Sequence, residues 1–81
     1  MSSRLAELDA LMADPDYQPT LASPAVVAGL FGVTRSAVSK MSERTERTGV
    51  KRYPGGKVDA VAVARWLLRR DQSKVTRSRR G

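Results

Sequence analysis

The sequence predicts a mainly α-helical domain with one small β-hairpin, and three observations lead to this prediction. Apolar residues recur at helical spacing between residues 24 and 44, on both sides of a glycine at position 32. Residues 50–58 read as two short strands around a Pro-Gly-Gly turn. Residues 60–71 are apolar over much of their length, which is typical of a helix that packs into a core.

The chain begins with a predicted amphipathic helix and a linker. Leu5, Leu8, Leu11 and Met12 form a helical stripe after two serines that can cap the helix. This helix can cover the chain's own core or contact a second copy. Residues 14–19 contain two prolines, which end the helix, and residues 20–22 can be briefly extended.

A second helix is predicted to begin at Pro24. Ser23 can cap it, and proline is well accommodated at the first helical position because no amide bond is lost there. Val27 and Phe31 share one face and are expected to point inward. Gly32 can take the positive φ that ends the helix and turns the chain.

A third helix is predicted to follow the turn, with Thr34 as its cap. Val38 and Met41 lie on its inner face. Two helices arranged in this way are typical of a helix-turn-helix, which presents its second helix to the major groove of DNA. An ordinary helical hairpin with a solvated outer face would show the same stripe. The side chains expected on the outer face are Arg35, Ser36, Ser39, Lys40 and Glu43.

The predicted hairpin at residues 50–58 is basic. Lys51, Arg52 and Lys57 flank a tip whose glycines, Gly55 and Gly56, allow a close approach to a sugar-phosphate chain. In this position after a helix-turn-helix, such a hairpin is called a wing; it can also simply connect two helices. A nucleotide-binding phosphate loop is excluded, since that motif would need a glycine at position 51 and a hydroxyl at position 58, where Lys51 and Val58 stand.

The last predicted helix starts after Asp59, which can cap it. Trp66 is expected to anchor the core, whereas Arg65, Arg69 and Arg70 are expected to cover the outer side. The tail that follows is rich in Lys and Arg. It can clamp phosphates as an arm or continue as a helix used in assembly. The predicted organisation is therefore an N-terminal helix and linker (1–19), a central domain (20–71) and a basic tail (72–81).

Charge and composition narrow the function. The net charge is +7, and it divides unevenly: residues 1–34 carry one base and four acids, whereas residues 35–81 carry fourteen bases and four acids. The step in charge falls where the outward-facing helix begins, as expected if that part faces a polyanion. The chain has no Cys and no His, which argues against an enzyme, a metal or a cofactor. No apolar run could span a bilayer and the N-terminus is acidic, so a cytoplasmic location is expected.

Two motifs carry a family resemblance. The pattern A-x-x-F-G occupies residues 28–32, and D-x-x-x-V-x-x-W occupies residues 59–66 with the basic, glycine-rich hairpin before it. From residue 27 to residue 71 this order resembles the winged-helix domains of the MerR-like group. More narrowly, it resembles the DNA-binding domain of the small terminase subunit of lambda-like phages. Phage excisionases share the same architecture.

The resemblance implies a protein that binds packaging sites on viral DNA, forms oligomers and recruits the large ATPase-nuclease subunit. An excisionase would work with an integrase instead. Full small terminases continue well past the winged helix, whereas this chain ends at Gly81, so the chain can be a fragment or a stand-alone DNA binder.

The sequence thus predicts a winged helix-turn-helix domain that binds duplex DNA sequence-specifically, as a phage-type small terminase module. The alternatives are an excisionase or transcriptional regulator of the same fold, a protein-interaction or assembly domain, and, least favoured, a small enzyme. The expected partners are double-stranded DNA, further copies of the chain in a dimer or larger oligomer, and a large terminase subunit or an integrase; no membrane is expected. The predicted DNA-binding residues are Thr34, Arg35, Ser36, Ser39, Lys40, Arg44, Lys51, Arg52, Gly55, Gly56, Lys57, Arg77, Arg79 and Arg80.

Overall fold

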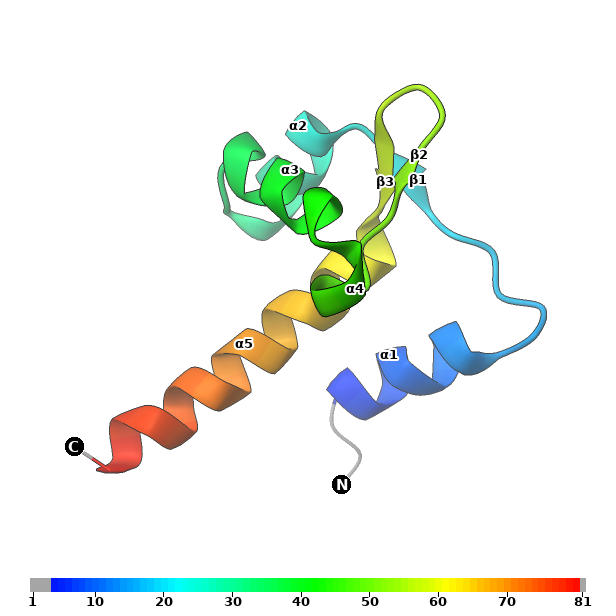
Figure 1. Ribbon diagram of the computed structural model, residues 1–81. Coiled ribbons are helices and arrows are strands. Elements are labelled where there is room, and N and C mark those ends of the chain that lie inside the picture. Colours follow the sequence, from blue (N-terminus) through cyan, green and yellow to red (C-terminus); the bar gives the residue numbers. More distant parts are fainter. Residues whose placement is uncertain (1–3, 81) are drawn as a thin grey trace.

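The protein is mainly helical and contains a small three-stranded antiparallel sheet (Figure 1). The computed structural model describes the backbone of residues 4–80 and the side chains of residues 4–70. The elements in chain order are α1 (Arg4–Ala13), β1 (Leu21–Ala22), α2 (Pro24–Phe31), α3 (Arg35–Glu43), α4 (Thr45–Thr48), β2 (Arg52–Tyr53), β3 (Lys57–Asp59) and α5 (Ala60–Arg80).

The sheet has the strand order β1-β3-β2, with β3 in the centre. The predicted hairpin is confirmed as β2 and β3, in which Arg52 pairs with Val58. The extended segment after the linker proves to be a third strand, because Leu21 pairs with Asp59 on the other edge of β3. The sheet therefore contains one strand more than the hairpin that the sequence predicts.

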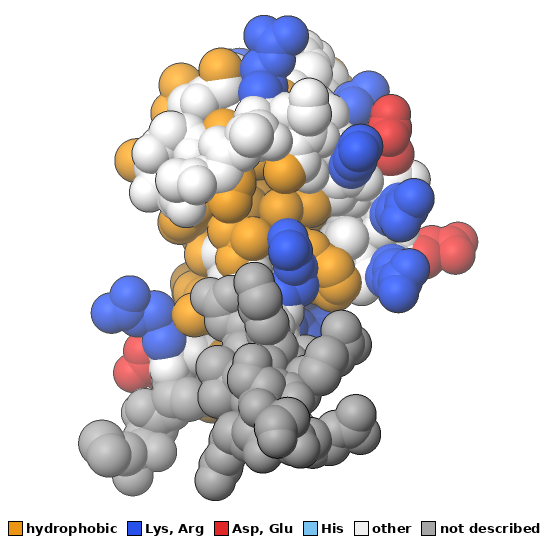
Figure 2. All heavy atoms as spheres, turned by 90° about the vertical axis from the view of Figure 1, so that its left-hand side faces the viewer, with side chains coloured by type: hydrophobic (Ala, Val, Ile, Leu, Met, Phe, Trp, Pro, Cys, Tyr) orange, Lys and Arg blue, Asp and Glu red, His pale blue; other side chains and the backbone are white. Residues whose placement is uncertain are grey.

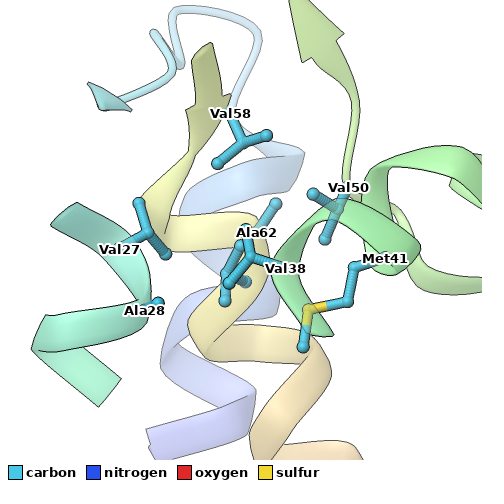
Figure 3. Close-up of a cluster of buried hydrophobic side chains, with 8 residues drawn as sticks. Val27, Ala28, Val38, Met41, Val50, Val58 and Ala62 are labelled. Carbon is cyan, nitrogen blue, oxygen red and sulfur yellow. The ribbon is translucent and has the colours of Figure 1, made fainter. Parts of the chain in front are cut away.

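The core lies where α2, α3 and α5 meet below the sheet (Figure 3). Each of these helices contributes apolar side chains, and two valines come from β3 and from the segment before β2. The inward orientation predicted for Val38 and Met41 is confirmed, since they are 0% and 4% exposed. Trp66 packs against this cluster while remaining partly exposed. The buried apolar residues are Val27, Ala28, Val38, Met41, Val50, Val58, Ala62 and Val63.

The predicted caps and turn around α2 are confirmed. The Ser23 hydroxyl oxygen accepts a hydrogen bond from the Val26 amide at 3.3 Å, and Pro24 takes the first helical position. Gly32 ends the helix with a φ of +67° in the left-handed region, which a residue with a Cβ atom adopts at a steric cost. Thr34 then caps α3 by accepting a hydrogen bond from the Ala37 amide at 3.1 Å.

The expectation that Phe31 points inward with Val27 is wrong. Val27 is fully buried, but Phe31 is 37% exposed. The two residues share a helix face, yet the buried residues of α2 are Val27 and Ala28, one turn before the helix ends. Phe31 is the last residue of α2, immediately before the turn at Gly32, and its ring therefore stays at the edge of the core.

Helix α1 packs against α5 without burying any residue of its own (Figure 1). Met12 reaches the edge of the core, and Asp9 forms an ion pair with Arg65 at 3.7 Å. The prediction that Arg65 covers the outer side of the last helix is therefore wrong. Its side chain is 20% exposed and points inward, because α1 and the segment at Gly49 lie over that side of α5.

Helix α5 continues without a break through Arg80. The predicted boundary between the central domain and the tail, after residue 71, thus falls inside this helix. The side chains of the tail residues lie outside the described part of the chain. Among the helices of the described part, none is long and apolar enough to cross a membrane.

Asp59, at the end of β3, joins the linker to the start of α5. Its buried carboxylate accepts hydrogen bonds from the amide of Val61 at 3.0 Å and from the amide of Thr20 at 3.1 Å. It also accepts a hydrogen bond from the hydroxyl of Tyr17 in the linker. The predicted cap of the last helix is thus confirmed, and the same side chain holds the linker against the sheet. Burial, together with the bond to Asp59, raises the pKa of the Tyr17 hydroxyl, so this group stays protonated and able to donate.

Two glycines near the end of α2 provide a matched test of this local structure. Gly29 lies inside the helix with nothing within 4 Å of the position of an added Cβ atom, so Gly29→Ala is expected to stabilise the domain by about 0.5–1 kcal/mol. Gly32 has the same open surroundings but a positive φ, so Gly32→Ala is expected to destabilise it by about 1 kcal/mol. Urea unfolding followed by circular dichroism measures both changes. If both substitutions stabilised the domain, or both destabilised it, the left-handed turn assigned to Gly32 would be contradicted.

Candidate functional site

The outer face of α3 is polar and basic. Val38 and Met41 hold the helix on the core, and Arg35, Ser36 and Lys40 are exposed on the other side, as predicted. The first turn contains no acidic residue, although an acid is the residue that the helix dipole favours there. The helix therefore begins with an exposed cation that its own fold does not require.

Two of the predicted α3 positions are used by the fold itself. The hydroxyl oxygen of Thr34 caps the helix, so its hydroxyl proton and one acceptor position stay available to another group. Ser39 is half-buried rather than exposed, and its carbonyl oxygen accepts a hydrogen bond from the Ser42 hydroxyl at 2.8 Å. The inner position of Ser39 is a correction to the predicted outer face, which is narrower than the sequence pattern indicates.

The polar segment after α3 forms the short helix α4, which sequence reasoning did not anticipate. The Thr48 hydroxyl lies 2.7 Å from the Met41 carbonyl oxygen and accepts a hydrogen bond from the Val50 amide at 3.1 Å. The Thr45 hydroxyl lies 2.9 Å from the carbonyl oxygens of both Ser42 and Val50. These hydroxyls therefore link the last turn of α3 to Val50, in the segment that leads into β2. They also explain why so polar a segment is ordered.

The hairpin presents three basic side chains around a glycine tip. Lys51, Arg52 and Lys57 are exposed, as predicted. Gly55 and Gly56 have φ values of +87° and +73°, and the Gly56 amide closes the turn by donating to the Tyr53 carbonyl oxygen at 3.1 Å. With no side chain at either glycine, the tip exposes its backbone.

One hydrogen bond joins the hairpin directly to α3. The Arg52 guanidinium donates from Nη2 to the Ser42 hydroxyl oxygen at 3.1 Å. Ser42 is 7% exposed and lies in the last turn of α3, whereas Arg52 is in β2. The Arg52 guanidinium is therefore held beside the end of α3.

Basic side chains gather along one edge of the face shown in Figure 2, with acidic side chains between them. Arg44 and Arg47 are exposed at α4, next to the exposed acids Glu43 and Glu46. Arg47 is absent from the predicted site, because its segment reads as a polar connector in the sequence. The sequence pointed to Arg47 only through its position between the predicted outward-facing helix and the predicted basic hairpin. Hydrophobic side chains occupy the middle of the same face.

Hydrogen bonds join the elements that carry the predicted site. The exposed cations of α3, α4 and the hairpin belong to consecutive elements joined by the hydroxyl contacts of Ser42, Thr45 and Thr48. The predicted tail residues Arg77, Arg79 and Arg80 have side chains outside the described part of the chain, so the structure does not place them at the site.

Within the part of the chain whose side chains are described, no cluster of His, Cys, Asp or Glu could hold a metal ion. Comparison of the chain with protein-family models, curated proteins and solved structures gives no match. Function is therefore inferred from the exposed side chains and their geometry.

Proposed function

We propose that this chain is a winged helix-turn-helix domain that binds duplex DNA sequence-specifically. Helix α3 enters the major groove, and the β2–β3 hairpin contacts the adjacent backbone or minor groove. The observation that carries the proposal is the hydrogen bond from Arg52 on the hairpin to Ser42 in the last turn of α3, because it joins two elements that both carry exposed cations. A helical hairpin with a merely solvated outer face does not require a basic β-hairpin bonded to its second helix.

The two groups of cations have different tasks in this proposal. Lys51, Arg52 and Lys57 bind phosphates and supply affinity that does not depend on sequence, because each contact releases condensed counterions. Arg35, Ser36 and Lys40 face the base edges. An arginine can donate two hydrogen bonds to a guanine in the major groove, and this gives sequence discrimination.

The family resemblance supports a more specific role. By that resemblance the domain recognises a packaging site on viral DNA as part of an oligomer and works in the host cytoplasm with a large terminase subunit. An excisionase that acts with an integrase, or a transcriptional regulator, has the same domain architecture. The genes adjacent to the coding sequence separate these roles, since a large terminase gene or an integrase gene is expected beside it.

A second candidate function is protein binding or assembly. Val26 and Leu30 on α2 are 55% and 66% exposed, and Phe31 lies beside them in the sequence. Large apolar side chains that share an exposed helix face often mark a contact with another protein. In this case the domain would bind DNA weakly and with little dependence on salt.

A titration with duplex DNA at several salt concentrations tests the proposed function. The six predicted cations with described side chains are Arg35, Lys40, Arg44, Lys51, Arg52 and Lys57. If the three of these that are assigned to phosphates, Lys51, Arg52 and Lys57, neutralise one phosphate each, the slope of log affinity against log salt is expected to be about −3, since each contact contributes ~0.9. Fluorescence anisotropy with a labelled duplex measures this slope. A slope near zero would exclude the DNA-binding role and favour the protein-binding candidate.

A further inference from the structure

We propose that Ser42 is a positioning residue that aims the Arg52 guanidinium at a single DNA phosphate. The inference rests on the proposed DNA-binding function and deepens it. Ser42 is 7% exposed and so makes no contact with DNA itself. It acts through Arg52, whose side chain is exposed apart from the bond that ties it to α3.

The direction of the Ser42–Arg52 bond is set by the hydroxyl group. A serine hydroxyl has a single proton to donate, and here that proton goes to the Ser39 carbonyl oxygen at 2.8 Å. The oxygen is therefore left as an acceptor where the Arg52 Nη2 atom meets it at 3.1 Å. A guanidinium can only donate, so the two groups match in one direction only.

The rest of the guanidinium stays available for a ligand. Arginine carries N–H donors on all three of its guanidinium nitrogens in a planar fork that fits a phosphate with two parallel hydrogen bonds. Holding Nη2 on Ser42 fixes the plane of that fork before DNA arrives. An arginine side chain has many rotamers, and restricting them in advance reduces the entropy lost on binding.

The last turn of α3, which carries Ser42, is itself held in place by further hydrogen bonds. Thr45 and Thr48 bond the end of α3 to Val50, two residues before Arg52. Val50 and Met41 are buried in the core on either side of this junction. The guanidinium is consequently fixed relative to α3 and not only relative to the hairpin, so one rigid unit carries both the groove-facing helix and the phosphate contact.

A double-mutant cycle in DNA affinity tests this role. Ser42→Ala is expected to weaken duplex binding about two- to tenfold, with an unchanged salt slope because the charge of Arg52 remains. Arg52→Ala is expected to weaken binding and to reduce the magnitude of the salt slope by ~0.9. In the Arg52→Ala background, Ser42→Ala should have no further effect. Lys51→Ala is the matched control: Lys51 is the neighbouring cation without a bond to Ser42, so the effect of Ser42→Ala should persist there in full.

Several outcomes would overturn the inference. The Ser42 effect could persist in the Arg52→Ala background, or Ser42→Ala could bind as wild type does while Arg52→Ala is weakened. If Ser42→Ala does not fold, as judged by circular dichroism, Arg52→Lys replaces it: this variant keeps the charge and the salt slope but loses the fork, and it is expected to bind about two- to tenfold more weakly. Binding of Arg52→Lys equal to wild type would refute the role. Failure of wild-type protein to bind duplex DNA at all would instead refute the proposed function.

Discussion

Replacing Asp59 with alanine is expected to destabilise the domain by about 3 kcal/mol or more. The variant loses the cap of α5, which is worth ~0.5–2 kcal/mol. It also leaves the Thr20 amide and the Tyr17 hydroxyl without their carboxylate partner, and hydrogen bonds to charged groups contribute ~1.5–3 kcal/mol each. Domains of this size have unfolding free energies near the lower end of ~5–15 kcal/mol, so Asp59→Ala should be close to unfolding at 37 °C. Urea unfolding followed by the fluorescence of Trp66, the single tryptophan, measures the loss.

The matched control removes one of the three bonds only. Tyr17→Phe keeps the ring and deletes the hydroxyl that donates to the Asp59 carboxylate, so a loss of about 1.5–3 kcal/mol is expected. The carboxylate, the α5 cap and the Thr20 bond all remain in this variant. If Asp59→Ala were no more costly than Tyr17→Phe, the carboxylate would be a simple helix cap and the linker would be held by other contacts.

Features with a local chemical signal were predictable from the sequence. Ser23, Thr34 and Asp59 are cap residues with a helix directly after them, and Gly32 lies where an apolar stripe breaks. Each of these signals depends on neighbours within a few residues, and the structure confirms all four. The hairpin is confirmed for the same reason, since its turn chemistry is local.

Features that depend on distant segments were not predictable in this way. Tyr17 and Asp59 are 42 positions apart, and nothing in the neighbourhood of either residue indicates the bond between them. Arg65 was expected on the outer side of α5, because a charged residue on an amphipathic helix is usually solvated. The packing of α1 and Gly49 against that side reverses this expectation.

The candidate site combines both kinds of feature. The exposed cations of α3 follow from its apolar stripe, because Val38 and Met41 decide which side faces outward. Helix α4 does not follow, because its hydroxyls also bond to the carbonyl oxygens of Val50 and Met41, which the folded junction brings within reach. For the same reason the sequence predicts Arg52 as a contact residue but does not identify Ser42 as its partner.

Replacing Arg35 with alanine is expected to flatten the preference of the protein among duplex sequences. Arg35 is the first residue of α3, and in a helix-turn-helix the N-terminal residues of the second helix contact base edges. Loss of one bidentate contact to guanine removes ~1–3 kcal/mol of discrimination at one base pair, which corresponds to roughly a fivefold to more than a hundredfold loss. Selection of a preferred duplex from a randomised pool, followed by titration of its single-base-pair variants, measures this loss.

Stability cannot account for this result, because Arg35 occupies a position that its helix does not favour. A cation in the first turn opposes the helix dipole by ~0.3–1 kcal/mol, and no acid in that turn offsets it. The Arg35→Ala variant should therefore be at least as stable as wild type. Lys57→Ala, on the hairpin, is the matched control: affinity should fall for all duplexes alike, with a salt slope smaller by ~0.9 and an unchanged preference.

The comparison between these two variants decides what α3 does. If Arg35→Ala behaves like Lys57→Ala, Arg35 contacts a phosphate, and base recognition would depend on Ser36 and Lys40, two other exposed residues of the outer face. If Arg35→Ala binds every duplex as wild type does, α3 does not lie in the groove. Arg35→Lys keeps the positive charge but removes the paired N–H donors of the guanidinium. This variant should keep the salt slope of wild type and lose the preference among duplex sequences, because an ammonium cannot make the paired hydrogen bonds of a guanidinium.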